Sequence, residues 1–289
     1  MKNKNMSKII LFLLPVLVLY FLFFIYPLGF VFFTSLTQWH GLGKMQFIGF
    51  ENFKNLFSDS VFLLSLKNNI IWAFVLGFIQ VPLACVMAMV LCRKPKGWKF
   101  FRTIYFLPNV ISQVALAMMW LAIYNADHGL LNSLLNVFTG SQITTSWLGS
   151  NSTALPAVII QQLFYIGYFM IVILASRVGI PESYYEAAEL DGANVWQEET
   201  KITLPMLKPI LVTTITLGMA YGMRHFESTF LMTGGGPNHA TSVMGILLYT
   251  KLEARKYGVG SAIGATLIIF GAVVIALIRR FLNHNQTEF

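Results

Sequence analysis

Six long apolar stretches alternate with polar segments along this 289-residue chain. They cover residues 9–36, 68–91, 104–124, 154–176, 210–230 and 258–278. Each holds about the 20 mainly apolar residues that an α-helix needs to cross roughly 30 Å of hydrocarbon. Lipid offers the backbone no hydrogen-bond partner, so such segments are expected to be helices. The pattern predicts an all-α polytopic membrane protein with six transmembrane helices, forming a single membrane domain over residues 1–289.

Two polar segments are too patterned to be simple loops. In the first, Asp127–Ser152, apolar residues recur at helical spacing, which predicts a short amphipathic helix on the outer face. These residues are Leu130, Leu131, Leu134, Leu135 and Phe138. The second segment, residues 178–209, is predicted to lie on the inner side.

The inner segment is predicted to form two short helices joined by a kink. Ser183-Tyr-Tyr-Glu186 has the spacing of a capping box. Asp191-Gly192 predicts the end of that helix, because glycine readily adopts the positive φ of a helix terminus. A second helix is expected over Val195–Lys201, with Pro205 and Pro209 ending it before the fifth span. From these residues alone, the object is either an interfacial connector or a docking element.

Composition and charge favour the membrane interpretation. Hydrophobic residues make up 56% of the chain and charged residues 11%, against roughly 25% charged residues in a soluble domain. The net charge of +8 comes from basic residues scattered over the loops, which argues against a nucleic-acid partner. With the N-terminus inside, the inner segments collect most Lys and Arg, including the cluster from Arg93 to Arg102. This bias predicts that both termini are cytoplasmic.

The chain lacks the residue patterns of an enzyme or an energy-converting subunit. It has no phosphate-binding loop, no metal-ligand spacing and no nucleophile–base arrangement. Cys85 and Cys92 are interpreted as membrane-embedded thiols. We therefore expect a non-catalytic chain that binds no cofactor or metal, so that any driven transport takes its energy from a partner.

Ionisable residues occur in one span only, at Arg224, His225 and Glu227. A channel or an ion-coupled carrier, the main alternative, would be expected to carry acidic residues at mid-membrane in more spans and no docking loop. One helical turn brings Tyr221, Arg224 and His225 near one face. Either these residues line a translocation pathway, or Arg224 and Glu227 pair and extend toward the outer interface.

The inner segment resembles the conserved loop of bacterial ABC importer permeases. The matching residues are Glu186, Ala187, Ala188, Asp191, Gly192, Ala193, Ile202, Leu204 and Pro205. The resemblance implies the type I permease fold, with residues 183–205 as a coupling helix that docks on an ATPase subunit. Glu199 stands where the sugar-importing subgroup usually has Phe, which predicts a more polar docking surface or a different groove on the partner.

Further stretches resemble the maltose-type sugar permeases, notably Phe101–Pro108 and Leu231–Pro237. The resemblance implies a sugar or oligosaccharide importer of the bacterial inner membrane that works by alternating access. It implies a second, different permease subunit, two ATPase subunits that bind ATP and Mg, and an external solute-binding protein.

The resemblance also bears on the substrate pathway. Counted back from Gly235-Gly236-Pro237, Arg224 and His225 match an Asn pair that lines the sugar site of the maltose-type subunit. Basic residues there favour an anionic sugar, because Arg pairs well with carboxylate or phosphate. Further candidates for binding sugar hydroxyls are Gln80, Asn109, Gln113, Gln161 and Gln162, although each could instead bond across helices.

Overall fold

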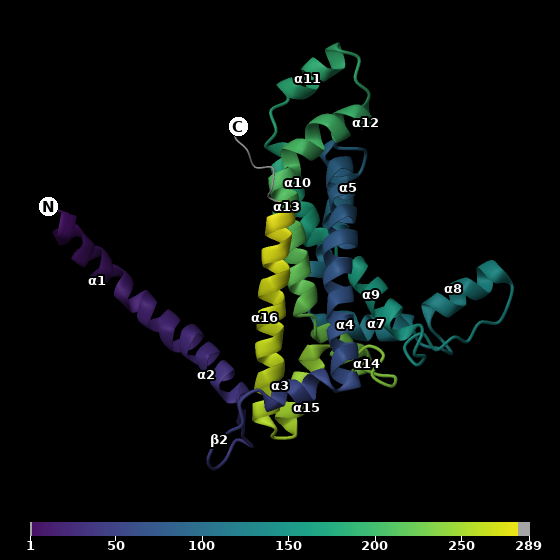
Figure 1. Cartoon of the computed structure of the whole chain (residues 1–289). Helices are drawn as coiled ribbons and strands as arrows, with labels where there is room; N and C mark the ends of the chain where they lie inside the picture. The colour runs from purple at the N-terminus through teal and green to yellow at the C-terminus, as the bar shows by residue number, and fades with distance from the viewer. Residues whose placement is uncertain (1, 283–289) are drawn as a thin grey trace. The chain divides into compact units, whose positions relative to one another are not determined.

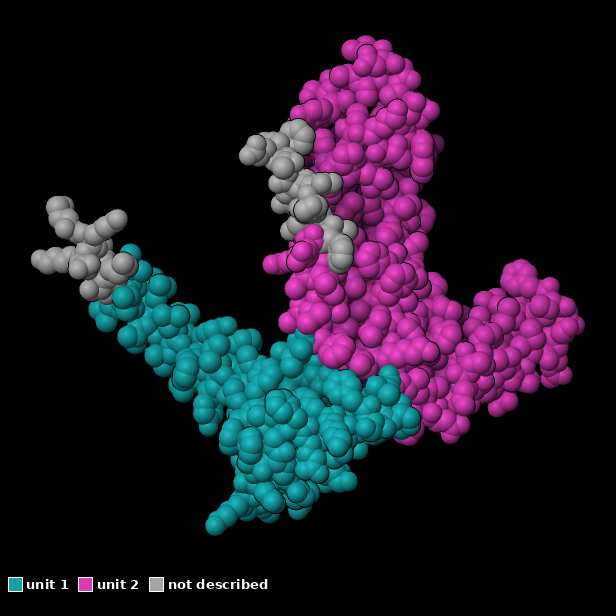
Figure 2. All heavy atoms as spheres, in the orientation of Figure 1, with its two compact units in different colours: residues 1–63, 247–269 teal, residues 64–246, 270–289 magenta. Residues whose placement is uncertain are grey.

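The computed structural model describes the backbone of residues 2–282 and the side chains of residues 9–280. The chain divides into two compact units, one of residues 1–63 and 247–269, the other of residues 64–246 and 270–289 (Figure 2). Whether the whole chain acts as a single domain stays a prediction.

The first unit is built around the N-terminal helices and the start of the last one (Figure 1). Its elements are α1 (Lys2–Tyr20), a π-helical turn (Phe21–Ile25), α2 (Tyr26–Ser35), the short antiparallel strands β1 (Thr37–Gln38) and β2 (Gln46–Phe47), α3 (Glu51–Phe57), and parts of α15 (Met244–Glu253) and α16 (Tyr257–Leu282). The Thr34 hydroxyl donates to that of Ser261 over 2.8 Å, which ties α2 to α16. The stretch from Ile9 to Phe24 exposes apolar side chains throughout, as expected of a surface in lipid.

The second unit contains most of the remaining helices. They are α4 (Ser60–Val75, which begins in the first unit), a π-helical turn (Leu76–Gln80), α5 (Val81–Cys92), α6 (Trp98–Phe106), a 3₁₀ turn (Leu107–Asn109), α7 (Gln113–Ile123), α8 (Leu130–Thr139), α9 (Ala154–Leu163), α10 (Gly167–Val178), α11 (Ser183–Leu190), α12 (Val195–Glu198), a π-helical turn (Glu199–Thr203), α13 (Leu204–Met223) and α14 (Glu227–Thr233). Figure 1 shows α11 and α12 beyond one end of α5, α10 and α13. The amphipathic helix predicted within Asp127–Ser152 is α8.

The helices confirm an all-helical membrane protein. Five helical segments of the described chain are long and apolar enough to cross a bilayer: Ile9–Ser35, Ser60–Cys92, Ala154–Val178, Val195–Thr233 and Tyr257–Arg280. The predicted third span differs, because α6 and α7 are bent by 102° between Asn109 and Gln113. Pro108 cannot donate a backbone hydrogen bond, and the Ser112 hydroxyl caps the new helix by accepting from the N–H of Ala115.

Each π-helical turn ends two residues before a proline: Pro27, Pro82 and Pro205. In a regular helix, a proline ring collides with the carbonyl four residues earlier. A π turn bonds each N–H to the carbonyl five residues back, which leaves room for the ring. The prediction that Pro205 and Pro209 end the second inner helix is therefore wrong, and the chain stays helical from Val195 to Met223.

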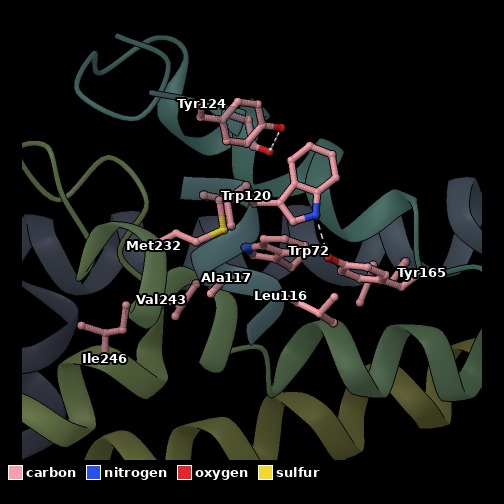
Figure 3. Close-up of a cluster of buried hydrophobic side chains, with 12 residues drawn as sticks. Trp72, Leu116, Ala117, Trp120, Tyr124, Tyr165, Met232, Val243 and Ile246 are labelled. Carbon is pink, nitrogen blue, oxygen red and sulfur yellow. Dashed lines mark hydrogen bonds between the residues drawn. The ribbon is translucent and has the colours of Figure 1, made fainter. Parts of the chain in front are cut away.

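The second unit packs closely where glycines replace side chains. A Cβ on Gly222 would overlap the backbone of Trp72 and Ala73, and one on Gly218 would come within 2.8 Å of the Leu76 carbonyl oxygen. Small residues four apart let α13 approach α4 in this way. Around this contact lies a buried cluster that includes Trp72, Trp120 and Tyr165 (Figure 3), in which the Trp120 indole donates to the Tyr165 hydroxyl over 2.7 Å.

The helix predicted over residues 210–230 is interrupted, because α13 ends at Met223 and α14 begins at Glu227. Asn69 supports this break. Its amide donates to the carbonyls of Gly222 (3.3 Å) and Met223 (2.9 Å), and its oxygen accepts from the N–H of Met244 (2.8 Å). Asn69 is only 1% exposed, so it supplies partners that water cannot.

We expect Asn69→Leu to destabilise the protein strongly. Leucine has nearly the same size but cannot bond, and each buried backbone group left without a partner costs about 1–3 kcal/mol. In detergent, the unfolding temperature should fall clearly for Asn69→Leu. It should change little for Asn55→Leu, a matched change at an exposed asparagine. Equal unfolding temperatures for Asn69→Leu and the unaltered protein would contradict this role.

Candidate functional site

A cavity of about 520 Å³ lies in the second unit, and the two interruptions of helix both contribute to its wall. All seven residues predicted for a substrate pathway line it: Gln80, Asn109, Gln113, Tyr221, Arg224, His225 and Glu227. They come from three separate parts of the sequence, around residues 80, 109–113 and 221–227. The fold thus brings together residues that the sequence could only name one by one.

The bend between α6 and α7 supplies one side of the cavity. Pro108 and Asn109 stand at the end of the 3₁₀ turn, and Gln113 begins α7. Gly167 lets α10 approach this bend, since a Cβ there would overlap the carbonyl oxygen of Tyr105. The close approach places Asn109 beside the start of α10.

The interruption after α13 supplies another side. Tyr221 lies in the last turn of α13, and Arg224 is the first residue beyond it. The sequence predicts that these residues share one face of a continuous helix. In the structure the helix ends at Met223, and the residues on either side of its end line the cavity together. His225 stacks on Trp72 with ring centroids 3.7 Å apart, and its Nε2 lies 2.8 Å from the Ser228 hydroxyl.

The charged groups at the cavity do not pair with each other. Among the described side chains, no salt bridge joins Arg224 to Glu227, and the Arg224 guanidinium lies 5.5 Å from the centre of the Tyr221 ring. Both charged residues are exposed. The alternative in which the two neutralise each other is not the arrangement of this structure.

Sequence reasoning missed the aromatic side of the cavity. Tyr165, Tyr168 and Phe169 line it from the start of α10 and the turn before it. Their clustering around the turn of residues 164–166 was the available signal. Of the two remaining glutamines, Gln162 lines the cavity and its carbonyl accepts from the Gln80 amide over 2.8 Å. Gln161 is fully buried and is not part of the lining.

The inner loop forms the predicted pair of helices, α11 and α12, with a different cap. The predicted capping box at Ser183 and Glu186 is wrong, because Glu186 N–H already bonds to the Glu182 carbonyl and Ser183 lies inside the first turn. A capping box occurs instead at Asn194 and Gln197, at the start of α12.

Gly192 ends α11 as predicted. Its φ is +78°, its N–H donates to the Glu189 carbonyl, and the N–H of Ala193 donates to the Ala188 carbonyl. This pair of bonds is the Schellman motif, which reverses the chain direction tightly after a helix. The kink between the two helices therefore depends on a conformation that glycine adopts without strain.

The surface of the loop is largely exposed and partly apolar. Leu190 is 90% and Trp196 76% exposed, and Glu186, Ala187 and Asp191 are exposed as well. Ala188, Ala193, Ile202 and Leu204 are half-buried, and Pro205 is exposed. Such apolar side chains on a helical loop are typical of a docking surface.

Glu199 lies inside the protein, where it cannot make an exposed docking surface more polar. It is 8% exposed, and one of its oxygens is 2.9 Å from Arg93 and 3.6 Å from Arg177. Glu198 lies 2.7 Å from Arg93. Burial lowers the pKa of Arg93, but the hydrogen bonds with Glu198 and Glu199 outweigh this and hold the pKa above its ordinary value. Within the described part of the chain, no three His, Cys, Asp or Glu side chains gather as a metal site would require.

Apolar helices long enough to cross a bilayer, a partly open cavity with polar lining residues and an exposed loop are features expected of a membrane transport protein. Residues 80–287 match the family described as binding-protein-dependent transport system inner membrane component. The chain belongs to this family, and it is a permease subunit of a binding-protein-dependent ABC importer, not an enzyme.

Relatives of known name extend the match over nearly the whole chain. The chain is 36% identical to "Probable ABC transporter permease protein YurN" of Bacillus subtilis (strain 168), covering 98% of this chain and 99% of the relative. It is 30% identical to "Trehalose/maltose transport system permease protein MalF" of Thermococcus litoralis, covering 94% and 93%.

Solved structures share the fold. A chain of a bacterial ABC transporter involved in the import of the acidic polysaccharide alginate has a TM-score of 0.85 at 22% identity, covering 99% of this chain and 98% of that one. A chain of the alginate transporter in complex with an alginate pentasaccharide-bound periplasmic protein has a TM-score of 0.82 at 26% identity, covering 98% and 95%.

We expect the cavity to contain water. In a background with Cys85→Ala and Cys92→Ala, a cysteine at the cavity-lining position of Gln113 should react rapidly with a water-soluble thiol reagent. A cysteine at Val158, which is 0% exposed in the neighbouring core, should react slowly. Equal rates at the two positions would show that the cavity is not open to water.

Proposed function

We propose that this chain conducts a sugar or oligosaccharide into the cytoplasm by alternating access, after delivery by an external binding protein. The observation that carries the proposal is the cavity, where amide, aromatic and charged side chains from separate helices meet. Amides can bond sugar hydroxyls, and aromatic rings can pack against the apolar faces of a sugar. Two relatives are named as trehalose/maltose and multiple-sugar transport permeases, which supports this class of substrate.

We propose the following assembly for the importer. This chain acts as one permease domain beside a second, different permease subunit, with two ATPase subunits that bind ATP and Mg on the cytoplasmic side. Both termini and the loop of residues 183–205 face the cytoplasm, where the exposed Leu190 and Trp196 would dock on an ATPase. This chain itself would bind no cofactor.

The proposed substrate carries an acidic group that Arg224 recognises. Arg224 is the cationic side chain of the cavity with no salt bridge among the described residues, and a guanidinium binds carboxylates in a two-point geometry. The structures with the same fold belong to a transporter of an acidic polysaccharide, which favours the same chemistry. Glu227 would repel an acidic group, so we assign it to sugar hydroxyls.

Gly192→Leu is expected to uncouple the loop from transport. The site has free space for a side chain, so only the positive φ opposes the change, at about 1–2 kcal/mol. The kink should open and α12 should shift, which lowers both uptake and the ATP hydrolysis stimulated by the binding protein. Gly192→Asn is the matched control, because asparagine tolerates this conformation. If the binding protein stimulates ATP hydrolysis as strongly in Gly192→Leu as in the unaltered importer, this loop has no coupling role.

Arg224→Gln is expected to abolish most uptake of an acidic oligosaccharide while leaving the amount of protein in the membrane unchanged. The shorter, uncharged amide removes the positive charge that the carboxylate needs, and Arg224→Lys should restore part of the uptake. Glu227→Gln, a neutralisation on the same wall, should not produce the same loss. Unchanged uptake by Arg224→Gln at unchanged abundance would exclude this residue from acid recognition.

A further inference from the structure

A cluster of four charged residues lies where the inner loop meets the ends of two core helices. Arg93 directly follows α5, and Arg177 lies in the last turn of α10. Glu198 ends α12, and Glu199 opens the π-helical turn that leads into α13. The cluster has two charges of each sign, so it is balanced as a unit.

Burial makes the cluster unusual for charges at the end of a helix bundle. Arg177 is 8% exposed, Glu198 4% and Glu199 8%. Arg93 is partly open to solvent, with 36% of its side chain exposed. Buried charges are costly unless they are paired, so these side chains constrain one another far more than surface ions would.

Glu199 is the centre of the contacts. It accepts a hydrogen bond from Arg93 Nε over 3.0 Å and lies 3.6 Å from a terminal nitrogen of Arg177. Two helices that are far apart in the sequence are thus joined through one carboxylate of the loop. Glu198 adds a second bond to Arg93, over 2.7 Å.

The same cluster also reaches α11. The guanidinium of Arg177 lies 4.0 Å from the centre of the Tyr185 ring, and the Tyr185 hydroxyl is 2.9 Å from the hydroxyl of Thr203. Tyr185 is the buried residue of α11. Both helices of the loop therefore contact the same cluster of side chains, although most of their other side chains are exposed.

We propose that Glu199 is a positioning residue that locks the inner loop to the ends of α5 and α10, so that a displacement of the loop moves both helices. This inference rests on the proposed function, because it assigns the path by which ATPase movement reaches the spans. Without the ionic contacts, the loop would keep the Tyr185–Thr203 contact and its continuous helix into α13, but it would lose its charged links to the ends of α5 and α10.

Glu199→Gln tests the lock in the complete importer, reconstituted with its ATPases, second permease and binding protein. The amide keeps the size but leaves two arginines facing one carboxylate. We expect ATP hydrolysis to continue while the amount of substrate transported per ATP falls severalfold. Glu182→Gln, which removes an exposed carboxylate at the start of the same loop, should retain the wild-type ratio.

A double variant separates positioning from stability. Glu199→Gln combined with Arg177→Met removes one charge of each sign, so protein abundance and thermal stability should recover toward wild type. The connection to α10 stays broken, so substrate transported per ATP should remain low. If this ratio returns to wild type together with stability, Glu199 has only a structural role and the inference is wrong.

The same experiment distinguishes this inference from the proposed function. If the unaltered importer shows no stimulation of ATP hydrolysis by the binding protein, the proposed function itself fails. If the unaltered importer couples normally and Glu199→Gln transports as much per ATP, only the lock is excluded.

Discussion

The structure depends on one constraint: backbone groups in an apolar bundle must find their partners inside the protein. Interruptions of a helix are tolerated at such sites only where other groups satisfy the backbone or where a polar cavity reaches it. Asn69 bonds to the carbonyls at the end of α13. The polar cavity lined by Asn109 and Arg224 reaches both interruptions of helix. The two broken helices and the cavity are therefore one feature, and under the proposed function this feature would form part of the path of a polar solute.

A single stretch of helix joins this cavity to the inner loop. From Val195 the chain continues through α12, the π-helical turn and α13 to Met223, just before Arg224. The 20 residues of α13 alone correspond to about 30 Å of helix. A tilt applied at the loop would therefore reach Tyr221 and Arg224 without passing through a flexible connection, and the charged cluster would pass the same movement to α5 and α10.

The sequence predicted the parts of this arrangement that follow from local pattern. Hydropathy located the long apolar segments but not the bend between α6 and α7 or the break after α13. Helical periodicity predicted α8, and the Asp191-Gly192 pair predicted the end of α11. Polar residues are costly in apolar spans, so they stand out in the sequence, and this is why the seven candidate pathway residues could be named in advance. All seven line one cavity in the structure. Local pattern could not show that a π turn accommodates Pro205, nor that Ser183 lies inside its helix. It also missed the pairing of Glu199 with Arg93 and Arg177, which depends on contacts between distant segments.

The central claim is that the cavity opens to one side of the membrane at a time under the control of ATP. The direct measurement uses the complete importer in proteoliposomes, with Cys85 and Cys92 replaced and a single cysteine at Tyr221. A thiol reagent that cannot cross the bilayer is applied from one side at a time, first without nucleotide and then with the ATPases trapped by vanadate. The account predicts that the side from which this cysteine reacts changes between the two states. Reaction from the same side and at the same rate in both states would contradict it.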